Sequence, residues 1–148
     1  MNSLQINNLM KFENSHFSKT TNYYKLEMSF GNFFLCEKFI ISELNAGIHF
    51  DWPKIEEVVT DILNFYDKKD KLGYISNRIN SYSVDPQIWA KVEKYNNNNF
   101  VVGGTIVYYN DMMYMNASLE KRFSKVNLHP CQSLDEAIEW ILSLEALK

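Results

Sequence analysis

The sequence predicts an α/β domain with a mixed, mostly parallel sheet, an antiparallel hairpin at its start and about four helices. Three observations lead to this fold class. The chain has 148 residues, a length suited to one hydrophobic core. Between residues 23 and 148, predicted strands alternate with segments in which apolar residues recur every three or four positions, as in helices. Alternation of strands and helices is typical of right-handed crossovers between parallel strands.

Residues 1–22 differ from the rest of the chain in composition. They are polar, rich in Asn and Ser, and only weakly periodic. Phe12 and Phe17 are the side chains able to attach this segment to a core. We therefore expect residues 1–22 to form a flexible or loosely docked arm, and residues 23–148 to form one domain.

The opening hairpin is predicted from two neighbouring runs. Residues 24–30 alternate apolar and polar side chains, the period-two pattern of a half-buried strand. Gly31 and Asn32 indicate a turn, and residues 33–44 are rich in aromatic and β-branched side chains, as in a second strand. Further strands are predicted at residues 72–76, 100–109 and 126–129.

Each of the four predicted helices begins at a residue whose side chain can accept a hydrogen bond from a free backbone N–H group. These N-cap residues are Asp51, Asp85 (followed by Pro86), Asn110 or Asp111, and Ser133, which forms a capping box with Glu136. Asn96 to Asn99 are predicted to end the second helix. Apolar spacing predicts which side chains face inward. The predicted inward residues of the first, third and fourth helices include Val58, Ile62, Leu63, Met112, Met115, Leu119, Phe123, Leu134, Ala137, Ile138, Ile141 and Leu142. The alternative for residues 112–115 is an adaptable contact surface, which methionines beside an aromatic side chain can form.

Charge and hydropathy argue against several classes of function. The formal net charge is -3, and acidic residues interrupt the densest Lys and Arg windows. The chain therefore lacks the basic surface that binding to nucleic acid or to an anionic membrane requires. No stretch approaches the roughly 20 apolar residues of a membrane span, and residues 1–22 lack the apolar core of a secretory signal. We expect a cytoplasmic protein without membrane insertion.

A resemblance to a known family is carried by five segments together with the element order. The segments are Gly31-Asn32-Phe33, Tyr74-Ile75-Ser76-Asn77-Arg78, Tyr82-Ser83-Val84-Asp85-Pro86, Glu120-Lys121 and Ala137-Ile138-Glu139-Trp140. From about residue 30 to residue 142 the chain resembles the STAS fold of anti-sigma-factor antagonists and sulfate-transporter tails. It looks most like small bacterial STAS-like proteins. The resemblance implies that residues 23–148 form a STAS-like domain that docks to a partner protein.

The segment that follows the predicted strand at residues 72–76 is the candidate site. Ligands and partners of open α/β sheets gather beyond the carboxyl ends of parallel strands. The residues expected to bind a partner or ligand are Ser76, Asn77, Arg78, Asn80 and Tyr82. Arg78 could bind a carboxylate or a phosphate with two hydrogen bonds. The alternative is that Arg78 pairs with Asp85 and the nearby serines only satisfy turn backbone groups.

Two serines in this segment are candidate phosphorylation sites. In the antagonists that the chain resembles, phosphorylation of a serine at the start of the helix after the third strand blocks docking. Ser81 and Ser83 lie in the matching region. A phosphate there would add roughly two negative charges beside the Asp85 cap.

The remaining reactive side chains predict no metal site, no catalytic residues and no cofactor. The histidines His16, His49 and His129 and the cysteines Cys36 and Cys131 do not have the spacing of a metal-binding motif. The Cys131 and His129 pair lacks a third group that would orient a nucleophile and its base. Gly103 and Gly104 lie inside an apolar strand, which favours close helix packing over phosphate binding.

The leading functional hypothesis is a non-enzymatic, STAS-like interaction or regulatory module. It would dock to another protein through residues 76–83 and the adjacent helices, and the edge of the hairpin offers a route to a homodimer. The alternative is a carrier of a small apolar ligand, with a pocket between the sheet and the helices lined by aromatic residues such as Tyr74, Tyr82 and Trp89.

Overall fold

The computed structural model describes residues 9–95 and 100–148. The strands are β1 (Tyr23–Met28), β2 (Gly31–Cys36), β3 (Phe39–Leu44), β4 (His49–Phe50), β5 (Leu72–Asn77), β6 (Ser83–Val84), β7 (Val101–Val107) and β8 (Leu128–Cys131). The helices are α2 (Phe17–Thr20), α3 (Trp52–Phe65), α4 (Ile88–Tyr95), α5 (Asp111–Phe123) and α6 (Leu134–Leu142), with short 3₁₀ helices η1 (Phe12–Asn14) and η3 (Glu145–Leu147). The predicted helix end at Asn96 to Asn99 lies outside the described residues.

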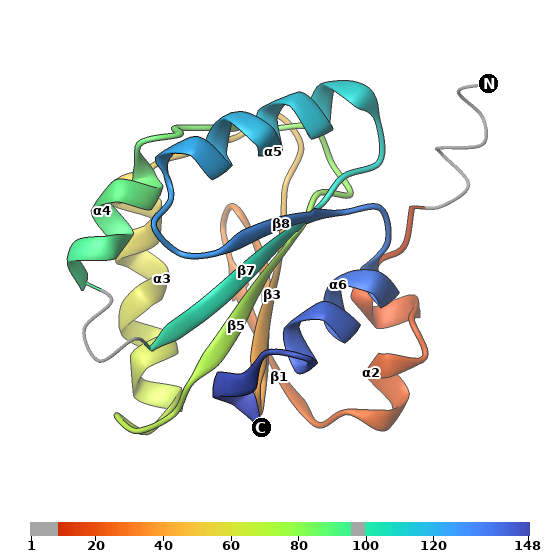
Figure 1. Cartoon of the computed structure of the whole chain (residues 1–148), viewed down its shortest axis with the longest axis vertical. Helices are drawn as coiled ribbons and strands as arrows, with labels where there is room; N and C mark the ends of the chain where they lie inside the picture. The colour runs from red at the N-terminus through yellow and green to blue at the C-terminus, as the bar shows by residue number, and fades with distance from the viewer. Residues whose placement is uncertain (1–8, 96–99) are drawn as a thin grey trace.

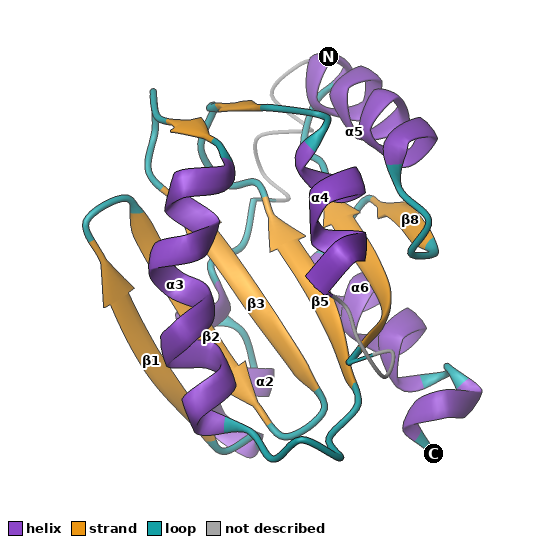
Figure 2. Ribbon diagram, turned by 90° about the vertical axis from the view of Figure 1, so that its left-hand side faces the viewer, coloured by secondary structure: helices purple, strands orange, loops and turns teal. Residues whose placement is uncertain are grey.

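The predicted fold class is confirmed. In the part of the chain that the structure describes, the main sheet has six strands in the order β1-β2-β3-β5-β7-β8. The pairs β1–β2 and β2–β3 are antiparallel, and β3–β5, β5–β7 and β7–β8 are parallel. Helices α3 and α4 cover one face of the sheet, and α6, with α2, covers the other (Figures 1 and 2).

The start of the sheet differs from the predicted hairpin. The predicted strand at residues 33–44 is two strands, β2 and β3, because the exposed residues Glu37 and Lys38 turn the chain between them. The first turn also lies earlier than Gly31, which begins β2 with a φ angle of +153°. A Cβ atom at this position would lie 2.6 Å from the Leu44 Cα atom, so the close approach of β3 requires glycine here.

The predicted caps of three helices are confirmed. Asp51 caps α3 by accepting from the Lys54 N–H, and Asn110 caps α5 by accepting from the Met113 N–H at 2.9 Å. Ser133 accepts from the Glu136 N–H at 3.1 Å at the start of α6. The second helix starts later than predicted, because Asp85 instead accepts from the Gln87 N–H and caps a turn before α4.

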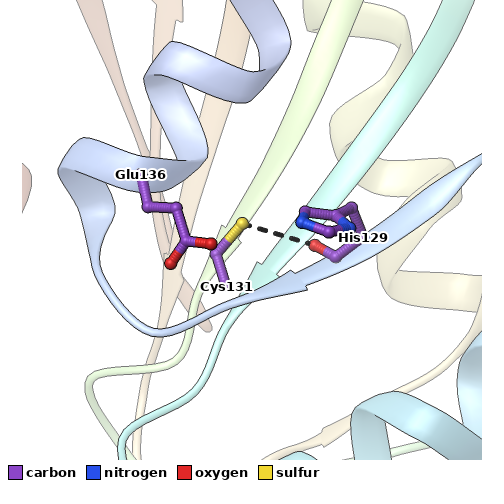
Figure 3. Close-up of side chains that lie close together, drawn as sticks. All are labelled: His129, Cys131 and Glu136. Carbon is purple, nitrogen blue, oxygen red and sulfur yellow. Dashed lines mark hydrogen bonds between the residues drawn. The ribbon is translucent and has the colours of Figure 1, made fainter.

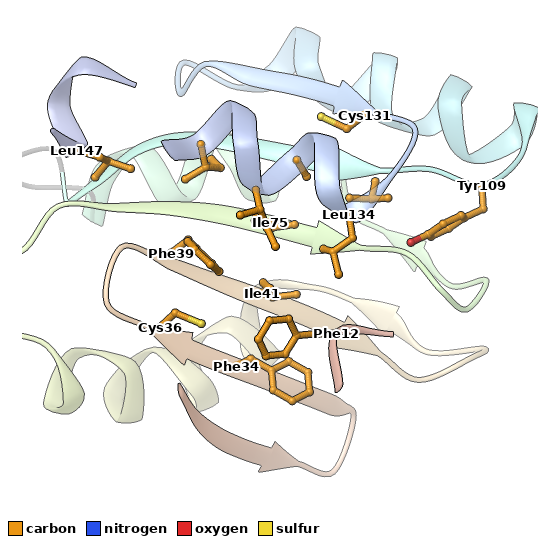
Figure 4. Close-up of a cluster of buried hydrophobic side chains, with 14 residues drawn as sticks. Phe12, Phe34, Cys36, Phe39, Ile41, Ile75, Tyr109, Cys131, Leu134 and Leu147 are labelled. Carbon is orange, nitrogen blue, oxygen red and sulfur yellow. The ribbon is translucent and has the colours of Figure 1, made fainter. Parts of the chain in front are cut away.

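Two apolar clusters lie on opposite faces of the sheet. One packs α6, η1 and η3 against β2, β3 and β5 (Figure 4). Within it, Ile138 and Ile141 of α6 are fully buried, as predicted. A Cβ atom on Gly103 would lie 2.7 Å from the Leu144 Cδ1 atom, which agrees with the close packing expected at this glycine. The other cluster packs α3, α4 and Ala117 of α5 against the opposite face.

The predicted inward face of α5 is wrong. Met112, Met115, Leu119 and Phe123 are all exposed, Met112 by 72% and Met115 by 70%. The side chains that α5 buries are Ala117 and Glu120. Leu63 of α3 and Leu142 of α6, also predicted to face inward, are exposed as well.

The N-terminal segment is attached more firmly than predicted in the residues that can be described. Phe12 is fully buried in the cluster with α6, where its ring lies against that of Phe34 (Figure 4). The Phe12 ring also contacts Tyr23. The Phe12 N–H donates to the Glu43 carboxylate at 2.7 Å. Within residues 9–22, Phe12 therefore belongs to the apolar core.

No helix within residues 9–95 and 100–148 has the length and apolar character needed to cross a membrane.

Candidate functional site

Residues 78–85 follow β5 at the end of the sheet where the parallel strands β3, β5 and β7 terminate (Figure 2). Backbone hydrogen bonds fix this segment to residues 47–50. The Ser83 N–H donates to the Ile48 carbonyl, the Gly47 N–H donates to the Ser81 carbonyl, and β6 pairs with β4. Residues 81–84 are therefore held by backbone hydrogen bonds at this end of the main sheet.

Alternation along β5 divides the predicted site residues between the two faces of the sheet. Ser76 and Arg78 point toward α4 and α5, whereas Asn77 points toward the N-terminal segment. All three side chains are buried. The Asn80 side-chain amide donates a hydrogen bond to the Leu44 backbone carbonyl at 3.0 Å.

Arg78 forms a buried ion pair with Glu120 of α5. The Nη1 atom lies 2.5 Å from Oε2 and the Nη2 atom lies 2.7 Å from Oε1, so both ends of the guanidinium group are engaged. Arg78 is 6% exposed and Glu120 is 2% exposed. The predicted alternative, a pair between Arg78 and Asp85, is therefore wrong. The partner of Arg78 lies 42 positions along the chain.

Further hydrogen bonds complete the surroundings of this pair. The Arg78 Nε–H donates to the Ser76 Oγ atom at 3.0 Å, and the Trp89 indole N–H donates to the Glu120 Oε1 atom at 3.0 Å. The Tyr82 ring lies 5.6 Å from the guanidinium carbon, and its hydroxyl lies 3.2 Å from the Ser76 Oγ atom. Each donor and acceptor that replaces water reduces the cost of burying the two charges.

Burial and neighbouring charge shift the pKa values of this cluster. Burial lowers the pKa of the Arg78 guanidinium group, but the paired Glu120 carboxylate outweighs it, so the net pKa is raised and the group stays protonated. Burial raises the pKa of the Tyr74 and Tyr82 hydroxyls, so both stay neutral at physiological pH. The cluster therefore presents one compensated ion pair and neutral hydroxyl groups.

An apolar cavity of about 120 Å³ lies beside this cluster, between the sheet and helices α3, α4 and α5. We call it the sheet–helix pocket. Its walls are aliphatic and aromatic, and its polar groups come from the cluster just described. The residues that line it are Phe33, Phe50, Ile55, Val58, Val59, Ile62, Tyr74, Ser76, Arg78, Tyr82, Val84, Ile88, Trp89, Val92, Val101 and Glu120.

The opposite face of β5 carries a second buried polar cluster. The Asn77 amide group donates to the Glu43 carboxylate and to the Met10 carbonyl, each at 2.8 Å. The Tyr109 hydroxyl donates to the Asn77 Oδ1 atom at 2.7 Å. Burial raises the pKa of Glu43 above its ordinary value and raises that of Tyr109 to about 12. This cluster holds the N-terminal segment in place.

The predicted site residues are thus separated into three groups. Ser76, Arg78 and Tyr82 line the sheet–helix pocket. Asn77 and Asn80 hold other parts of the chain in place. Ser81 and Ser83 are exposed, and the Ser83 Oγ atom lies 2.7 Å from the His49 Nδ1 atom.

Sequence reasoning did not identify Glu120 as a residue of the site. Its position three residues after Ala117 places both side chains on one face of α5. Helical spacing alone does not show that this face is buried, and the methionines on the other face favoured the opposite orientation.

His129, Cys131 and Glu136 also lie close together, at the junction of β8 and α6 (Figure 3). Their candidate ligand atoms lie within 4.8 Å of one another. Each residue already has a structural role. The Cys131 thiol donates to the His129 carbonyl, the Glu136 carboxylate accepts from the Gln132 N–H, and the His129 ring stacks on Trp140.

Burial, with a contribution from Glu136, raises the pKa of the Cys131 thiol to about 12. The N-terminus of α6 also carries the positive end of the helix dipole. We therefore assign these three residues to the packing of α6 against β8.

Comparison with known proteins gives no match: neither a protein-family model, nor a curated protein, nor a solved structure is similar to the chain. The resemblance to STAS-like proteins therefore remains a prediction from the sequence.

Proposed function

We propose that the chain is a non-enzymatic protein that binds a small, uncharged, mainly apolar molecule in the sheet–helix pocket. The observation that carries this proposal is an apolar cavity beside a fully compensated ion pair. A cavity of about 150 Å³ lined by apolar side chains stays dry and takes up benzene. The similar size of this pocket favours a ligand with one aromatic ring or a short branched hydrocarbon chain.

The charges at the pocket favour a neutral ligand. An anion would have to displace Glu120 from Arg78, and a cation would have to displace Arg78 from Glu120. Breaking a buried ion pair leaves one charge without a partner, at a cost of about 3–5 kcal/mol. A neutral ligand leaves the pair intact.

One polar group on the ligand has partners available. The Tyr82 hydroxyl and the Ser76 Oγ atom are 3.2 Å apart, a long distance for two hydroxyl groups. A hydroxyl or carbonyl group on the ligand could bond to Tyr82 while Ser76 keeps its bond from Arg78. We therefore expect phenol to bind more tightly than toluene.

Titration of the ¹⁵N-labelled protein with toluene, phenol and benzoate tests the proposal. Toluene and phenol should shift the amide resonances of residues that line the pocket, with a Kd on the order of 10⁻⁴–10⁻³ M for ligands of this size. Benzoate, which carries a charge, should produce no such shifts. Binding of benzoate but not of toluene would contradict the proposal.

A pocket-filling variant and a matched control sharpen this test. Val58 lines the pocket, so Val58→Phe should weaken phenol binding at least about tenfold by occupying the cavity. Leu63 lies on the same helix and is 54% exposed, so Leu63→Phe should leave binding unchanged. Equal effects of the two substitutions would exclude the pocket as the binding site.

A second candidate function is a STAS-like module that docks to a partner protein. Two observations support it: Ser81 and Ser83 are exposed, and α5 presents exposed apolar side chains. Ser76, Asn77 and Arg78 are buried and would not contact a docked protein in this conformation. The candidate docking surface is therefore limited to the exposed serines and the adjacent helices.

Substitution of the serines tests this second candidate. Ser83→Glu introduces a charge where the Ser83 Oγ atom contacts His49, and Ser81→Glu does so nearby. Either change should abolish capture of a specific partner, and Ser83→Ala should retain it. If both glutamate variants still capture the partner protein as the wild type does, the proposed phosphorylation switch is contradicted.

A further inference from the structure

Helix α5 exposes a continuous apolar stripe. Its members are Met112, Met115, Leu119 and Phe123, which are 72%, 70%, 44% and 41% exposed. Their spacing of three and four residues places them along one side of a helix. Methionine is a flexible side chain that adapts well to contact surfaces. A stripe of this kind indicates an interaction surface.

Two oppositely charged residues beside the stripe are placed so that they can pair with the same two residues of a second copy. Asp111 and Arg122 are eleven residues apart, which is about three helical turns, so both lie on the same flank of the stripe. Both side chains are exposed, and neither has an ion-pair partner in the described parts of the chain. The acid lies at the start of α5 and the base lies near its end.

An antiparallel pair of α5 helices would bring these groups together. In a two-fold dimer each contact occurs twice with the roles exchanged. With the axis at Ala117, Met115 of one copy lies opposite Leu119 of the other. Arg122 then lies one position from the residue opposite Asp111, and Phe123 lies one position from the residue opposite Met112, an offset of about 1.5 Å along the helix. One axis therefore brings the charged pair and both apolar pairs within reach of each other.

We infer that the chain forms a two-fold dimer through antiparallel contact of α5 with α5 of a second copy. This inference is independent of ligand binding in the sheet–helix pocket, because the stripe lies on the side of α5 away from the buried Ala117 and Glu120. A contact between two helices of 13 residues falls below the roughly 1,200 Å² of a standard interface. The dimer is therefore weak, with a Kd on the order of 10–100 µM.

Sedimentation equilibrium of the full chain, from about 5 to 500 µM, tests the dimer. The wild-type protein should change from monomer to dimer over this range. Met115→Ser should weaken the dimer at least about tenfold, because it removes an apolar side chain from both copies. Leu63→Ser is the matched control, since Leu63 is an exposed apolar residue on α3. It should leave the dimer unchanged.

Charge exchange tests the antiparallel arrangement. Asp111→Arg and Arg122→Asp should each weaken the dimer about two- to tenfold at low salt, because each places like charges opposite each other. The double variant Asp111→Arg with Arg122→Asp should restore the wild-type Kd within about twofold. A protein that stays monomeric at 500 µM overturns the inference. A dimer that responds to neither Met115→Ser nor the charge changes also overturns it, and would favour association through the edge strand β1.

Discussion

The two faces of β5 near its carboxyl end carry polar clusters that differ in what lies beside them. On one face, Asn77 bonds to Glu43, Tyr109 and the Met10 carbonyl, and Phe12 of the N-terminal segment packs in the apolar cluster there. On the other face, Arg78 and Ser76 belong to a cluster that borders a cavity. Both clusters lie in an apolar environment, where each polar group needs a partner.

A buried polar cluster alone therefore does not indicate a binding site. The Asn77 cluster attaches one part of the chain to another, and its groups are occupied by protein atoms. The Arg78 cluster meets its own hydrogen-bonding needs and still adjoins unfilled apolar space. That combination, more than the polar residues themselves, makes the Arg78 face the candidate for ligand binding.

The largest expected effect comes from breaking the ion pair. Arg78→Met should reduce the free energy of unfolding by about 3–5 kcal/mol, because it leaves the Glu120 carboxylate buried without its positive partner. Urea denaturation measures this change. The double variant Arg78→Met with Glu120→Leu should recover most of the loss, since no unpaired charge remains. A cost below ~1 kcal/mol for the single change would mean that the pair is not effectively buried.

The next largest effect concerns the contribution of the N-terminal segment, which packs on the Asn77 face, to the free energy of unfolding. Phe12→Ala should reduce the free energy of unfolding by about 3 kcal/mol, at the lower end for a buried aromatic ring because a terminal segment can readjust. Phe17→Ala is the control, because Phe17 is only partly buried beside the same cluster. Equal losses for the two variants, measured by thermal denaturation, would contradict the firm attachment at Phe12.

Substitution of one tyrosine on each face compares how strongly the two faces depend on a tyrosine hydroxyl. Tyr109→Phe removes the donor to the buried Asn77 Oδ1 atom and should cost about 1–3 kcal/mol. Tyr82→Phe should cost only about 0.5 kcal/mol, because Ser76 keeps its bond from Arg78. Guanidinium denaturation of both variants tests the order. A larger loss for Tyr82→Phe would show that the pocket face depends more strongly on its hydroxyl groups.

The smallest expected effect depends on pH and concerns Glu43. Burial raises the pKa of Glu43 in the folded state above 4.5, so its protonated form is favoured by folding. Its contribution to stability is present below pH 4.5 and is lost as the pH rises through the folded-state pKa. Glu43→Gln does not titrate, and its amide oxygen can still accept from Phe12 and Asn77. The stability of this variant relative to wild type should therefore increase as the pH rises.

Denaturation at several pH values between 4 and 8 tests this last prediction. Glu13→Gln is a useful control, because Glu13 is an exposed partner of Lys25. A difference between Glu43→Gln and wild type that stays constant with pH would show that Glu43 does not titrate in this range.

Local sequence signals predicted the elements well where short-range chemistry determines them. Asp51, Asn110 and Ser133 cap their helices because a side-chain oxygen reaches a backbone N–H three residues away. The apolar run of β7 indicated a buried strand because a central parallel strand is covered on both faces. The missed turn at Glu37 and Lys38 shows the limit of this approach, since the aromatic and β-branched composition on both sides looked continuous.

Neighbouring residues were enough to predict the α/β class, the alternation of strands and helices after α3 begins, and most helix starts. Only the tertiary structure decided that α5 turns Glu120 inward and its methionines outward. Periodicity identifies a stripe of similar side chains but does not state which way the stripe faces. In α5 the decision rests on Arg78, 42 positions away, which compensates the buried carboxylate that helical spacing alone would have placed in solvent.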